Sequence, residues 1–399
     1  MNISHVLNLD GIGGVERDFT SFIASPHAHK NGLAHKLTSG TIHQELKPLL
    51  ENNLTQISNY KQIGPLPVPK IGSLRSISLA ASLVRQNPSL VVFWNHMDRP
   101  SLLNVLHNKS IRTFYYEHGS AWRQNLKNHY KAFLSQVDFL LANSQAAKRM
   151  LELRWDVSRP VEVLPNALRP DIAPVHPQQK RLPQGRAFRI GIAARLVSHK
   201  GIFVALHTLY ALDKQGFQAE LYIAGRGPEK EAFLREARRL GLEKKIVFKG
   251  FVSDMSTFYQ EIDLFLLPSV REPFGLVSIE AQAWGCPVVL SRIDGLPETL
   301  TEGETGRTVT PTLPLSEYLQ MGGSNKKMPS LVYSPEADTV GAPKLTDPAL
   351  LAKQIISIGS LAKNYEQMSL NASVQTLKRF DYTQHIVALL EFFGKTKPL

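Results

Sequence analysis

Short apolar runs alternate with helical patterns along most of the chain, and this rhythm constrains the fold more than any other feature. In the first half, the predicted strands are Ile3–Leu9, Ala34–Ser39, Leu90–Asn95, Ile111–Tyr116, Phe139–Ala142 and Val161–Leu164. Helical patterns fall between them, among them Ile71–Arg85 and Gln145–Arg154. Alternation of this kind predicts an α/β domain whose parallel sheet is covered by helices on both faces.

The alternation stops in a proline-rich stretch, Pro165–Gly185, and then resumes, which predicts a linker between two domains. The chain of 399 residues is long enough for two domains of about 200 residues each. We therefore expect a first domain over 1–170 and a second over 187–379. The strands predicted in the second domain are Phe188–Ala194, Glu220–Ala224, Lys245–Lys249, Ile262–Pro268 and Pro287–Ser291.

One stretch of the second domain, 310–347, breaks this rhythm. It carries Pro, Gly, Ser and Lys with little apolar pattern. Because long structureless stretches are uncommon in compact domains, it is expected to be a mobile insertion, with a lid as the alternative. Helices are predicted after it, from Pro348 to Arg379 and over Tyr382–Phe393.

The amino-acid composition indicates the class of protein and the cellular compartment to expect. With 43% hydrophobic and 20% charged residues, the chain reads as an ordinary globular protein. No apolar run approaches the ~18 residues that span a bilayer, and the N-terminus shows no signal-peptide pattern. The single cysteine, Cys286, excludes an internal disulfide and fits a reducing cytoplasm, so a packed thiol is expected.

The positive charge is concentrated in the first half. Residues 1–186 hold 22 Lys and Arg against 12 Asp and Glu, whereas residues 187–399 hold 24 against 22. The two halves therefore carry +10 and +2 of the net +12. An electropositive first domain predicts anionic partners, namely a phosphorylated substrate, an acidic membrane surface or nucleic acid.

Two glutamates eight residues apart, Glu272 and Glu280, follow the strand predicted over Ile262–Pro268. Glu272 is expected on a loop at the carboxyl end of that strand, and Glu280 about two turns into the next helix. Eight residues at ~100° each leave Glu280 only ~80° from the starting direction, so both carboxylates can face one crevice. The N–H groups of Gly275 and Leu276 between them open a helix N-terminus, which suits anionic oxygens. The pattern fits a sugar–diphosphate–ribose ligand, and a solvated helix face is the alternative for an isolated pair.

Two cations, Arg195 and Lys200, flank the start of a helix after the strand Phe188–Ala194. Ligands of α/β sheets bind at this carboxyl edge. The two charges would neutralise a diphosphate and stabilise it as a leaving group, and a pair of surface charges is the alternative. His199 between them is expected to be a solvated loop residue.

The first domain offers a glycine loop and a histidine. Gly13 and Gly14 follow the first strand, where glycines let the backbone approach a ligand. The loop is not G-x-G-x-x-G, and no acidic residue stands ~20 positions later, which disfavours a nicotinamide cofactor. His118 follows the strand Ile111–Tyr116 at its carboxyl end, where a functional and a structural role are both open.

Together these motifs resemble those of the retaining family 4 glycosyltransferases of the GT-B fold. The matching stretches, in the family's order, are Gly13-Gly14, His118, Arg195 with Lys200-Gly201, Ala224–Pro228, Gly250–Val252, Glu272 with Glu280, and Asp294–Glu298. The resemblance spans nearly the whole chain, densely in the second half and loosely in the first. It implies two Rossmann-like doubly wound domains facing a central cleft, with a C-terminal helix, 380–399, packing back on the first domain.

The resemblance implies that Glu280 binds the nucleotide ribose and that Glu272 binds the donor sugar near the reacting carbon. It likewise implies that Arg195 and Lys200 hold the diphosphate and that His118 hydrogen-bonds the donor sugar. These last four residues form the expected catalytic set.

The remaining donor contacts implied by the resemblance come from backbone groups. The amides of Phe274, Gly275 and Leu276 would contact sugar or phosphate, and Gly13 and Gly14 would approach the donor. Because two side-chain cations face the diphosphate, neither a metal nor another cofactor is expected.

The activity implied is transfer of a sugar from a nucleoside-diphosphate donor to an acceptor hydroxyl with retention. A GT-B sugar-nucleotide epimerase and a basic nucleic-acid-binding protein are the alternatives. No zinc, RNP or OB pattern supports the second, so no nucleic-acid partner is expected. The identities of the sugar, the base and the acceptor stay open.

A basic and aromatic stretch after His118 predicts a membrane-facing surface. If 121–134 is one helix, Arg123, Lys127 and Lys131 recur along one stripe beside Trp122. Such a surface suits an anionic bilayer, and an ordinary amphipathic helix packed on the core is the alternative. Many family members extend lipopolysaccharide or lipid-linked glycans at the cytoplasmic membrane face. We therefore expect a cytoplasmic protein, bound peripherally, with a glycan or glycolipid acceptor.

Overall fold

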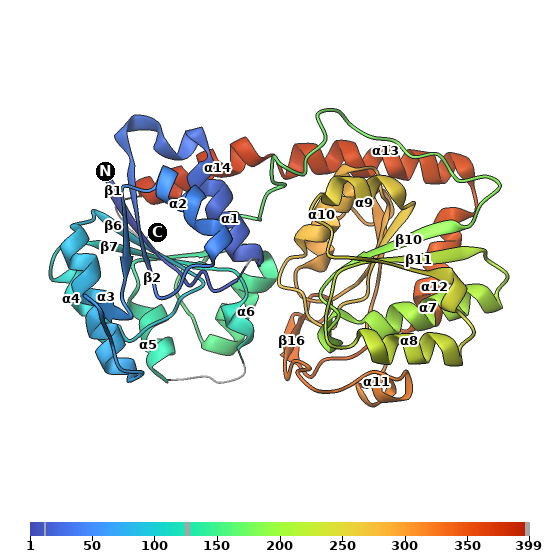
Figure 1. The fold of residues 1–399 in the computed structure, drawn as a ribbon, viewed down its shortest axis with the longest axis horizontal. Helices are drawn as coiled ribbons and strands as arrows, with labels where there is room; N and C mark the ends of the chain where they lie inside the picture. The colour runs from blue at the N-terminus through green and yellow to red at the C-terminus, as the bar shows by residue number, and fades with distance from the viewer. Residues whose placement is uncertain (12, 124–127, 396–399) are drawn as a thin grey trace. The chain divides into compact units, whose positions relative to one another are not determined.

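The computed structural model describes residues 1–11, 13–123 and 128–395, which form two compact units (Figure 1). Unit 1 comprises Met1–Asn166 together with Tyr382–Leu399, and unit 2 comprises Ala167–Asp381. In each unit, helices cover a parallel sheet on both faces, as the alternation in the sequence predicts.

The sheet of unit 1 has the strand order β3-β2-β1-β6-β7-β8-β9, with every pairing parallel. Its strands are β1 (Asn2–Val6), β2 (Ala34–Ser39), β3 (Gln56–Asn59), β6 (Leu90–Trp94), β7 (Arg112–Glu117), β8 (Phe139–Ala142) and β9 (Glu162–Val163). Its helices are α1 (Gly14–Ala24), α2 (Lys47–Asn53), α3 (Gly72–Gln86), α4 (Pro100–His107), α5 (Asn128–Gln136), α6 (Gln145–Trp155) and α14 (Tyr382–Gly394). A small antiparallel hairpin, β4 (Gln62–Ile63) and β5 (Leu66–Pro67), precedes α3.

The core of unit 1 includes a helix from the far end of the chain. Ile386, Leu389 and Phe393 of α14 are buried in the same cluster as Val92 of the central strand β6 and Phe22 of α1. Their apolar spacing of three and four residues places them on one face of α14. The last helix is therefore part of unit 1, although 215 residues of unit 2 separate it from the rest of that unit in sequence.

The sheet of unit 2 has the order β12-β11-β10-β13-β14-β15, again parallel throughout. Its strands are β10 (Phe188–Ala193), β11 (Ala219–Ala224), β12 (Ile246–Gly250), β13 (Leu264–Leu267), β14 (Val288–Ser291) and β15 (Gly306–Val309). Its helices are α7 (Ile202–Lys214), α8 (Lys230–Arg239), α9 (Met255–Glu261), α10 (Leu276–Ala283), α11 (Ser316–Gln320), α12 (Pro348–Gly359) and α13 (Ala362–Arg379). Strand order runs outward in both directions from β10 and β13, so the topological switch point lies between these two strands.

The prediction that 310–347 is a mobile, structureless insertion is wrong. The segment contains α11 and an antiparallel pair, β16 (Val332–Ser334) and β17 (Thr339–Gly341). Tyr318 and Leu345 are fully buried in the core cluster of unit 2. The polar composition conceals these anchors because they are few and widely spaced.

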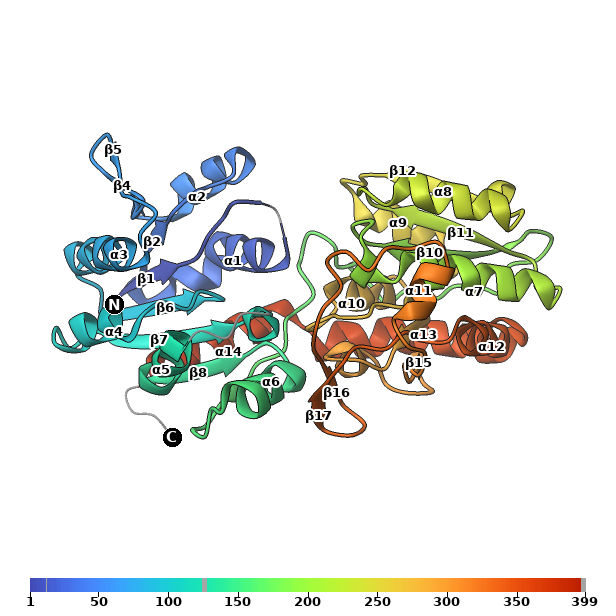
Figure 2. The ribbon, with the colours of Figure 1, turned by 90° about the horizontal axis from the view of Figure 1, so that it is seen from below.

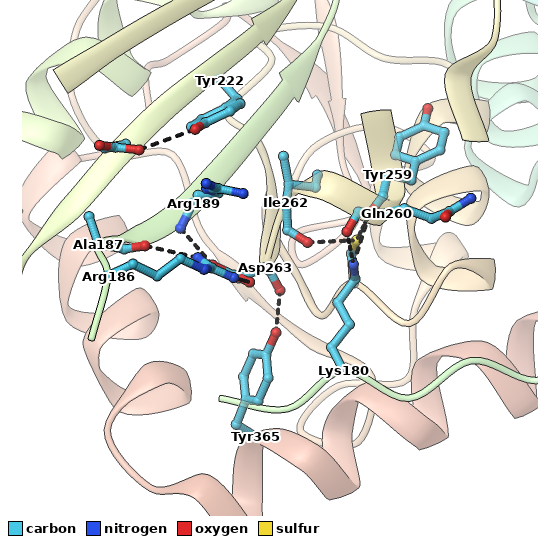
Figure 3. Close-up of polar contacts among 12 residues, drawn as sticks. Lys180, Arg186, Ala187, Arg189, Tyr222, Tyr259, Gln260, Ile262, Asp263 and Tyr365 are labelled. Carbon is cyan, nitrogen blue, oxygen red and sulfur yellow. Dashed lines mark hydrogen bonds and ion pairs between the residues drawn. The ribbon is translucent and has the colours of Figure 1, made fainter. Parts of the chain in front are cut away.

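The proline-rich stretch is irregular, but most of it packs on unit 2. Figure 3 shows the Lys180 ammonium directed at backbone carbonyls of α9, with hydrogen bonds of 2.9 Å to Tyr259 and 3.0 Å to Gln260. Arg186 forms a two-pronged ion pair with buried Asp263, at 2.6 and 2.8 Å. Tyr365 of α13 donates a 2.8 Å hydrogen bond to the carbonyl of Asp263. These contacts fasten 180–186 to the amino edge of the sheet.

Two further features concern the chemistry expected from composition. Cys286 is fully buried, and burial raises the pKa of its thiol to about 11, so it is a packing residue as predicted. Within the described ranges, no helix combines the length and apolar character required to cross a bilayer.

Candidate active site

Two loops meet at the carboxyl edge of the unit 2 sheet, beside its switch point. One follows β10 and contains a short 3-10 helix, η4 (Ser198–Lys200); the other follows β13. The N–H of Val270 donates a 2.9 Å hydrogen bond to the carbonyl of His199. Gly201 has φ +66°, and a Cβ there would lie 1.9 Å from the carbonyl oxygen of Pro268. Only glycine allows this approach, and it brings Lys200 to the neighbouring loop.

Lys200 and Glu272 form an ion pair across these two loops. The ammonium nitrogen lies 2.6 Å from Oε2 of the carboxylate. The two side chains are 19% and 13% exposed, so the pair is partly shielded yet reachable. The structure therefore brings together two residues that the sequence assigns to the diphosphate and to the donor sugar.

Asp294 holds the loop that carries Glu272. It follows β14, is 1% exposed and adopts a left-handed φ of 47°. One carboxylate oxygen accepts the N–H of Glu272 at 2.9 Å, and the other accepts the N–H of Tyr333 in β16 at 2.8 Å. At the adjacent Gly295, a Cβ would lie 2.2 Å from the carbonyl oxygen of Pro273. Loops after β13 and β14 are thereby pressed together backbone to backbone.

Helix α10 begins beside Glu272, as the sequence predicts. Gly275 is its N-cap residue, with φ +102°, and Leu276 is its first residue. Phe274 is 2% exposed and packs edge-to-face on Phe380, with ring centroids 5.9 Å apart. The Phe274 side chain thus anchors the loop in the core, which leaves only its backbone for the donor contact expected from the sequence.

Glu280 lies within α10 and takes part in a different set of contacts from Glu272. It is 7% exposed, and its Oε2 accepts a 2.8 Å hydrogen bond from the Tyr259 hydroxyl. Its Oε1 lies 3.6 Å from the guanidinium of buried Arg169. Burial, and then the charge of Glu280, raises the pKa of Tyr259 well above its ordinary value, so the hydroxyl stays a donor.

Positive charge gathers at the same edge. Arg195 is exposed just after β10, and Arg271 precedes Glu272. Burial first, and then the charges of Lys200, Arg271 and Arg195, lowers the pKa of His199 to about 3. His199 is half-buried and neutral, so its predicted place as a solvated residue is wrong. Arg271 is a further cation that the sequence analysis did not single out.

In unit 1, the glycine loop follows β1, next to the switch point between β1 and β6. Gly14 is the first residue of α1 and Gly13 is its N-cap, and both are exposed. The N–H of Gly13 donates a 3.1 Å hydrogen bond to the Glu16 carboxylate. A Cβ on Gly13 would lie 2.6 Å from that carboxylate, so a larger residue there would displace the Glu16 side chain from this capping contact.

The loop that carries His118 is fixed by two side-chain acceptors, those of Asn95 and Glu117. Asn95, with φ 53°, accepts the N–H groups of His118 at 3.2 Å and Ser120 at 2.8 Å through its side-chain oxygen. The Glu117 carboxylate, fully buried, accepts the N–H of Ala121 at 2.9 Å. The pKa of Glu117 is raised by burial, and hydrogen bonds from Tyr115, Ala121 and Gly119 oppose part of this rise.

His118 itself is enclosed by aromatic rings. Its ring lies 4.0 Å from that of Tyr116 and stacks on Trp94 at 5.7 Å. Burial, and then the charge of His385, lowers its pKa to about 3, so its 3.7 Å approach to Asp18 is that of a neutral imidazole. Nε2 of His118 has no hydrogen-bond partner among the described residues.

The predicted membrane face does not form as proposed. The stretch 121–134 is not one helix in the described residues, because a 3-10 turn, η3 (Ser120–Trp122), precedes α5, which starts at Asn128. Trp122 is 2% exposed and therefore belongs to the core. Lys131 is paired with Asp156, and Arg123 is exposed. Lys127 lies outside the described residues.

In the part of the chain that the structure describes, no group of three or more His, Cys, Asp or Glu side chains is arranged to hold a metal ion. The expectation of a reaction without a metal stays a prediction.

The residues that the sequence analysis overlooked are those that position the predicted ones. Asp294 begins the matching stretch Asp294–Glu298, but no role was predicted for it, and Arg271 directly precedes Glu272. Tyr259 and Arg169 contact Glu280 from segments far away in sequence. Only the tertiary structure reveals these two contacts.

The fold and the motifs define a family of enzymes. Residues 176–317 match the family model described as glycosyl transferases group 1. This match lies within unit 2 and confirms the resemblance to this family, and the GT-B fold of two parallel-sheet α/β domains, predicted from the sequence, is confirmed.

Individual relatives match part of the chain. The chain is 36% identical over 121 residues to the capsular polysaccharide biosynthesis glycosyltransferase CapM of Staphylococcus aureus, and the matched stretch covers 30% of this chain and 32% of that protein. The chain thus spans about a third of the length of the curated relatives it matches.

Solved structures extend the likeness over both units. A glycosyltransferase of Rickettsia africae has a TM-score of 0.73 at 17% identity, with 98% of this chain and 97% of that chain covered. HepE of Anabaena, solved in complex with UDP-glucose, has a TM-score of 0.69 at 18% identity, with 99% of each chain covered. At these identities, the likeness shows the fold.

Proposed function

We propose that this protein is a retaining glycosyltransferase that moves a sugar from a nucleoside-diphosphate donor to an acceptor hydroxyl. The observation that carries the proposal is the Lys200–Glu272 pair, 2.6 Å across, at the switch point of the unit 2 sheet. A cation and a carboxylate side by side, next to the start of α10, suit a diphosphate joined to a polyhydroxyl ring.

The reaction breaks the bond between sugar C1 and the diphosphate oxygen. Positive charge develops on the sugar ring, and negative charge develops on the departing diphosphate. Lys200, Arg195 and the N-terminus of α10 address the negative charge, and Arg271 adds a cation to the same edge. Preorganised charges of this kind are worth several kcal/mol in the transition state.

Retention follows if the acceptor attacks from the side on which the diphosphate leaves. Glu272 and His118 would orient the donor sugar for this attack. The acceptor hydroxyl gives its proton to the departing phosphate oxygen while the new C1–O bond forms. His118 acts as a neutral imidazole in this scheme, since its pKa of about 3 keeps the ring unprotonated.

The nucleotide is held by a separate set of residues. Glu280 would accept hydrogen bonds from the ribose hydroxyls. Its contacts with Tyr259 and Arg169 keep the carboxylate in one position and offset the cost of burying its charge. UDP is the first donor nucleotide to test, because HepE, which shares the fold, was solved with UDP-glucose.

For the acceptor, we propose a glycan or glycolipid held at an anionic membrane surface, of the lipopolysaccharide or lipid-linked type, on the cytoplasmic face. Unit 1, residues 1–166 and 382–399, holds 20 Lys and Arg against 12 Asp and Glu, and this excess supports an anionic partner. The similarity to a capsular polysaccharide biosynthesis glycosyltransferase supports a polysaccharide acceptor.

The proposal is tested first on the donor. Thermal unfolding with UDP-, GDP-, ADP- and dTDP-sugars should single out one base, because a ligand at a hundred times its Kd stabilises by ~2.7 kcal/mol. The selected donor is then incubated with and without glycolipid extracts. Transfer that requires an acceptor supports the proposal, whereas conversion of the sugar nucleotide alone identifies an epimerase. No stabilisation by any of the four contradicts donor binding.

A further inference from the structure

Unit 1 exposes a cluster of large apolar side chains on one hairpin and one helix. Ile63 and Leu66 of the β4–β5 hairpin are 67% and 71% exposed. Ile71, Leu74 and Ile77, at the start of α3, are 55%, 41% and 64% exposed. Single exposed apolar residues are ordinary, but five within fifteen residues are not. We call these five residues the hairpin–helix surface.

The base of the hairpin is anchored by buried residues, whereas its tip is exposed to solvent. Tyr60 and Val68, which flank it, are 6% and 7% exposed, and the N–H of Val68 donates a 2.8 Å hydrogen bond to the carbonyl of Lys61. Ile63 and Leu66 face each other across the two-residue turn at Gly64 and Pro65. Figure 2 shows the hairpin projecting from unit 1 beyond α3.

The outward face of α3 is apolar where a solvent-facing helix is normally polar. Leu74, Ile77, Ala81 and Arg85, spaced by three, four and four residues, are all exposed. The inward face of the same helix buries Leu79, Ala80 and Leu83 together with Ser76, Ser78 and Gln86. The helix therefore has its own buried apolar face, and the exposed Leu74 and Ile77 are apolar side chains outside it.

The stretch of sequence that forms this surface carries charge of a single sign, and the nearby Asp98 carboxylate is largely buried against His96 and Ser76. Between Glu51 and Asp98 the sequence contains no aspartate or glutamate, whereas it contains Lys61, Lys70, Arg75 and Arg85. Lys70 and Arg85 are exposed, one before the first turn of α3 and the other at its end. Cations beside bare Ile and Leu side chains complement an anionic headgroup layer with hydrocarbon beneath it.

We propose that unit 1 docks on an anionic lipid bilayer through the hairpin–helix surface. Ile63 and Leu66 enter the headgroup boundary, the outward face of α3 lies along it, and Lys70 and Arg85 contact the lipid phosphates. This deepens the proposed function, on which it rests only for the membrane-held acceptor. It also moves the expected membrane surface away from Trp122, which is buried.

Vesicle co-sedimentation of the full chain tests the docking. The vesicles contain phosphatidylcholine alone, or phosphatidylcholine with phosphatidylglycerol. Binding should require the anionic lipid and weaken as salt rises. Ile63→Ser/Leu66→Ser/Ile77→Ser should lower partitioning at least ~10-fold, because three exposed anchors no longer bury hydrocarbon. Lys70→Ser/Arg85→Ser should lower it roughly 25-fold, at about 5-fold per cation, and should reduce the salt dependence.

A matched control uses apolar residues exposed elsewhere in unit 1. Leu153 of α6 and Val387 of α14 are 40% and 44% exposed, and Leu153→Ser/Val387→Ser should bind vesicles within about twofold of the parent. A reporter, Leu66→Trp, should shift its emission to the blue only with anionic vesicles. All variants should keep the donor-induced thermal shift, so a docking failure is distinguishable from loss of the proposed donor site.

Three results would overturn the inference. The first is equal vesicle binding by the parent and the hairpin–helix variants. The second is an unchanged Leu66→Trp spectrum while the protein sediments with vesicles. The third is a change of oligomeric state in the apolar variant without a change in lipid binding, which would assign the surface to a second copy of the chain.

Discussion

Lys200 is predicted to contribute both to turnover and to the stability of unit 2. Comparison of Lys200→Met with a matched variant should separate these two contributions. In Lys200→Met, the Glu272 carboxylate loses a cation at 2.6 Å and stays only 13% exposed. Exposed ion pairs contribute ~0–1 kcal/mol, and removal of one partner from a fully buried pair costs ~3–5 kcal/mol. For this intermediate case we expect a loss of ~2 kcal/mol in unfolding free energy.

The same substitution removes a preorganised cation for the leaving diphosphate. A single such donor is worth ~10²–10³ in turnover, so kcat/KM should fall by this factor. Arg195→Met is the matched control, since Arg195 is exposed after the same strand. It should reduce kcat/KM similarly and leave the unfolding of unit 2 within about 1 °C of the parent.

Calorimetry and steady-state kinetics on three variants test the contributions of Lys200 to stability and to turnover. A loss of ~2 kcal/mol in a unit of this size lowers Tm by ~4–8 °C. Lys200→Met/Glu272→Gln should recover most of that loss, because the neutral amide needs no counter-charge, yet stay inactive. Activity of Lys200→Met within threefold of the parent would refute the phosphate role. Equal Tm values for Lys200→Met and Arg195→Met would refute the stability argument.

Three further predictions concern other parts of the two units. Glu280→Gln should weaken binding of the bare nucleoside diphosphate in calorimetry, whereas Glu272→Gln should leave that binding nearly intact and lower transfer; equal losses would contradict the two roles. Asp294→Gly should destabilise unit 2 by ~2–4 kcal/mol in thermal unfolding, because two buried N–H groups lose their acceptor and only part of the cost is offset by relief of the left-handed backbone. The pKa of His118 is about 3 in the folded protein against ~6.5 unfolded, so its contribution to stability is full above pH 6.5 and is lost as pH falls toward 3. Denaturant unfolding should show this as a slope of up to ~1.4 kcal/mol per pH unit between pH 6 and 4, smaller in His118→Asn; equal slopes would contradict it.

The sequence alone predicts most strands of the two sheets, because most are buried on both faces; the edge strands β3 and β15, which are less buried, were not predicted. Ala34–Ser39 and Phe139–Ala142 were predicted with the bounds of β2 and β8, and the helix after Asp381 was predicted from its first residue. A parallel strand between helices reads as a short, continuous apolar run, so its ends are sharp in the sequence. The same rhythm predicts the switch points, and with them the loops that carry Lys200 and Glu272.

What could not be predicted depends on contacts between distant segments. The stripe of Arg123 and Lys131 fits a helix by spacing, but Asn95 and Glu117 draw the chain into a tight 3-10 turn before α5. These acceptors lie at the ends of β6 and β7, and no local pattern reports them. Tertiary hydrogen bonds to these two acceptors here prevail over helical periodicity.

Asp294 shows how one side chain can stabilise two segments of the site at the cost of backbone strain. Its left-handed backbone would suit glycine better by local energetics, so the aspartate must repay that strain elsewhere. It does so with both carboxylate oxygens, one on the loop of Glu272 and one on β16. A second contact, 3.1 Å from the Ser198 hydroxyl to the carbonyl of Lys326, links the segment 310–347 to the other loop, beside Lys200. The segment 310–347 therefore contacts the Lys200 loop directly and the Glu272 loop through Asp294, and shortening it would disturb the geometry on which the proposed transfer depends.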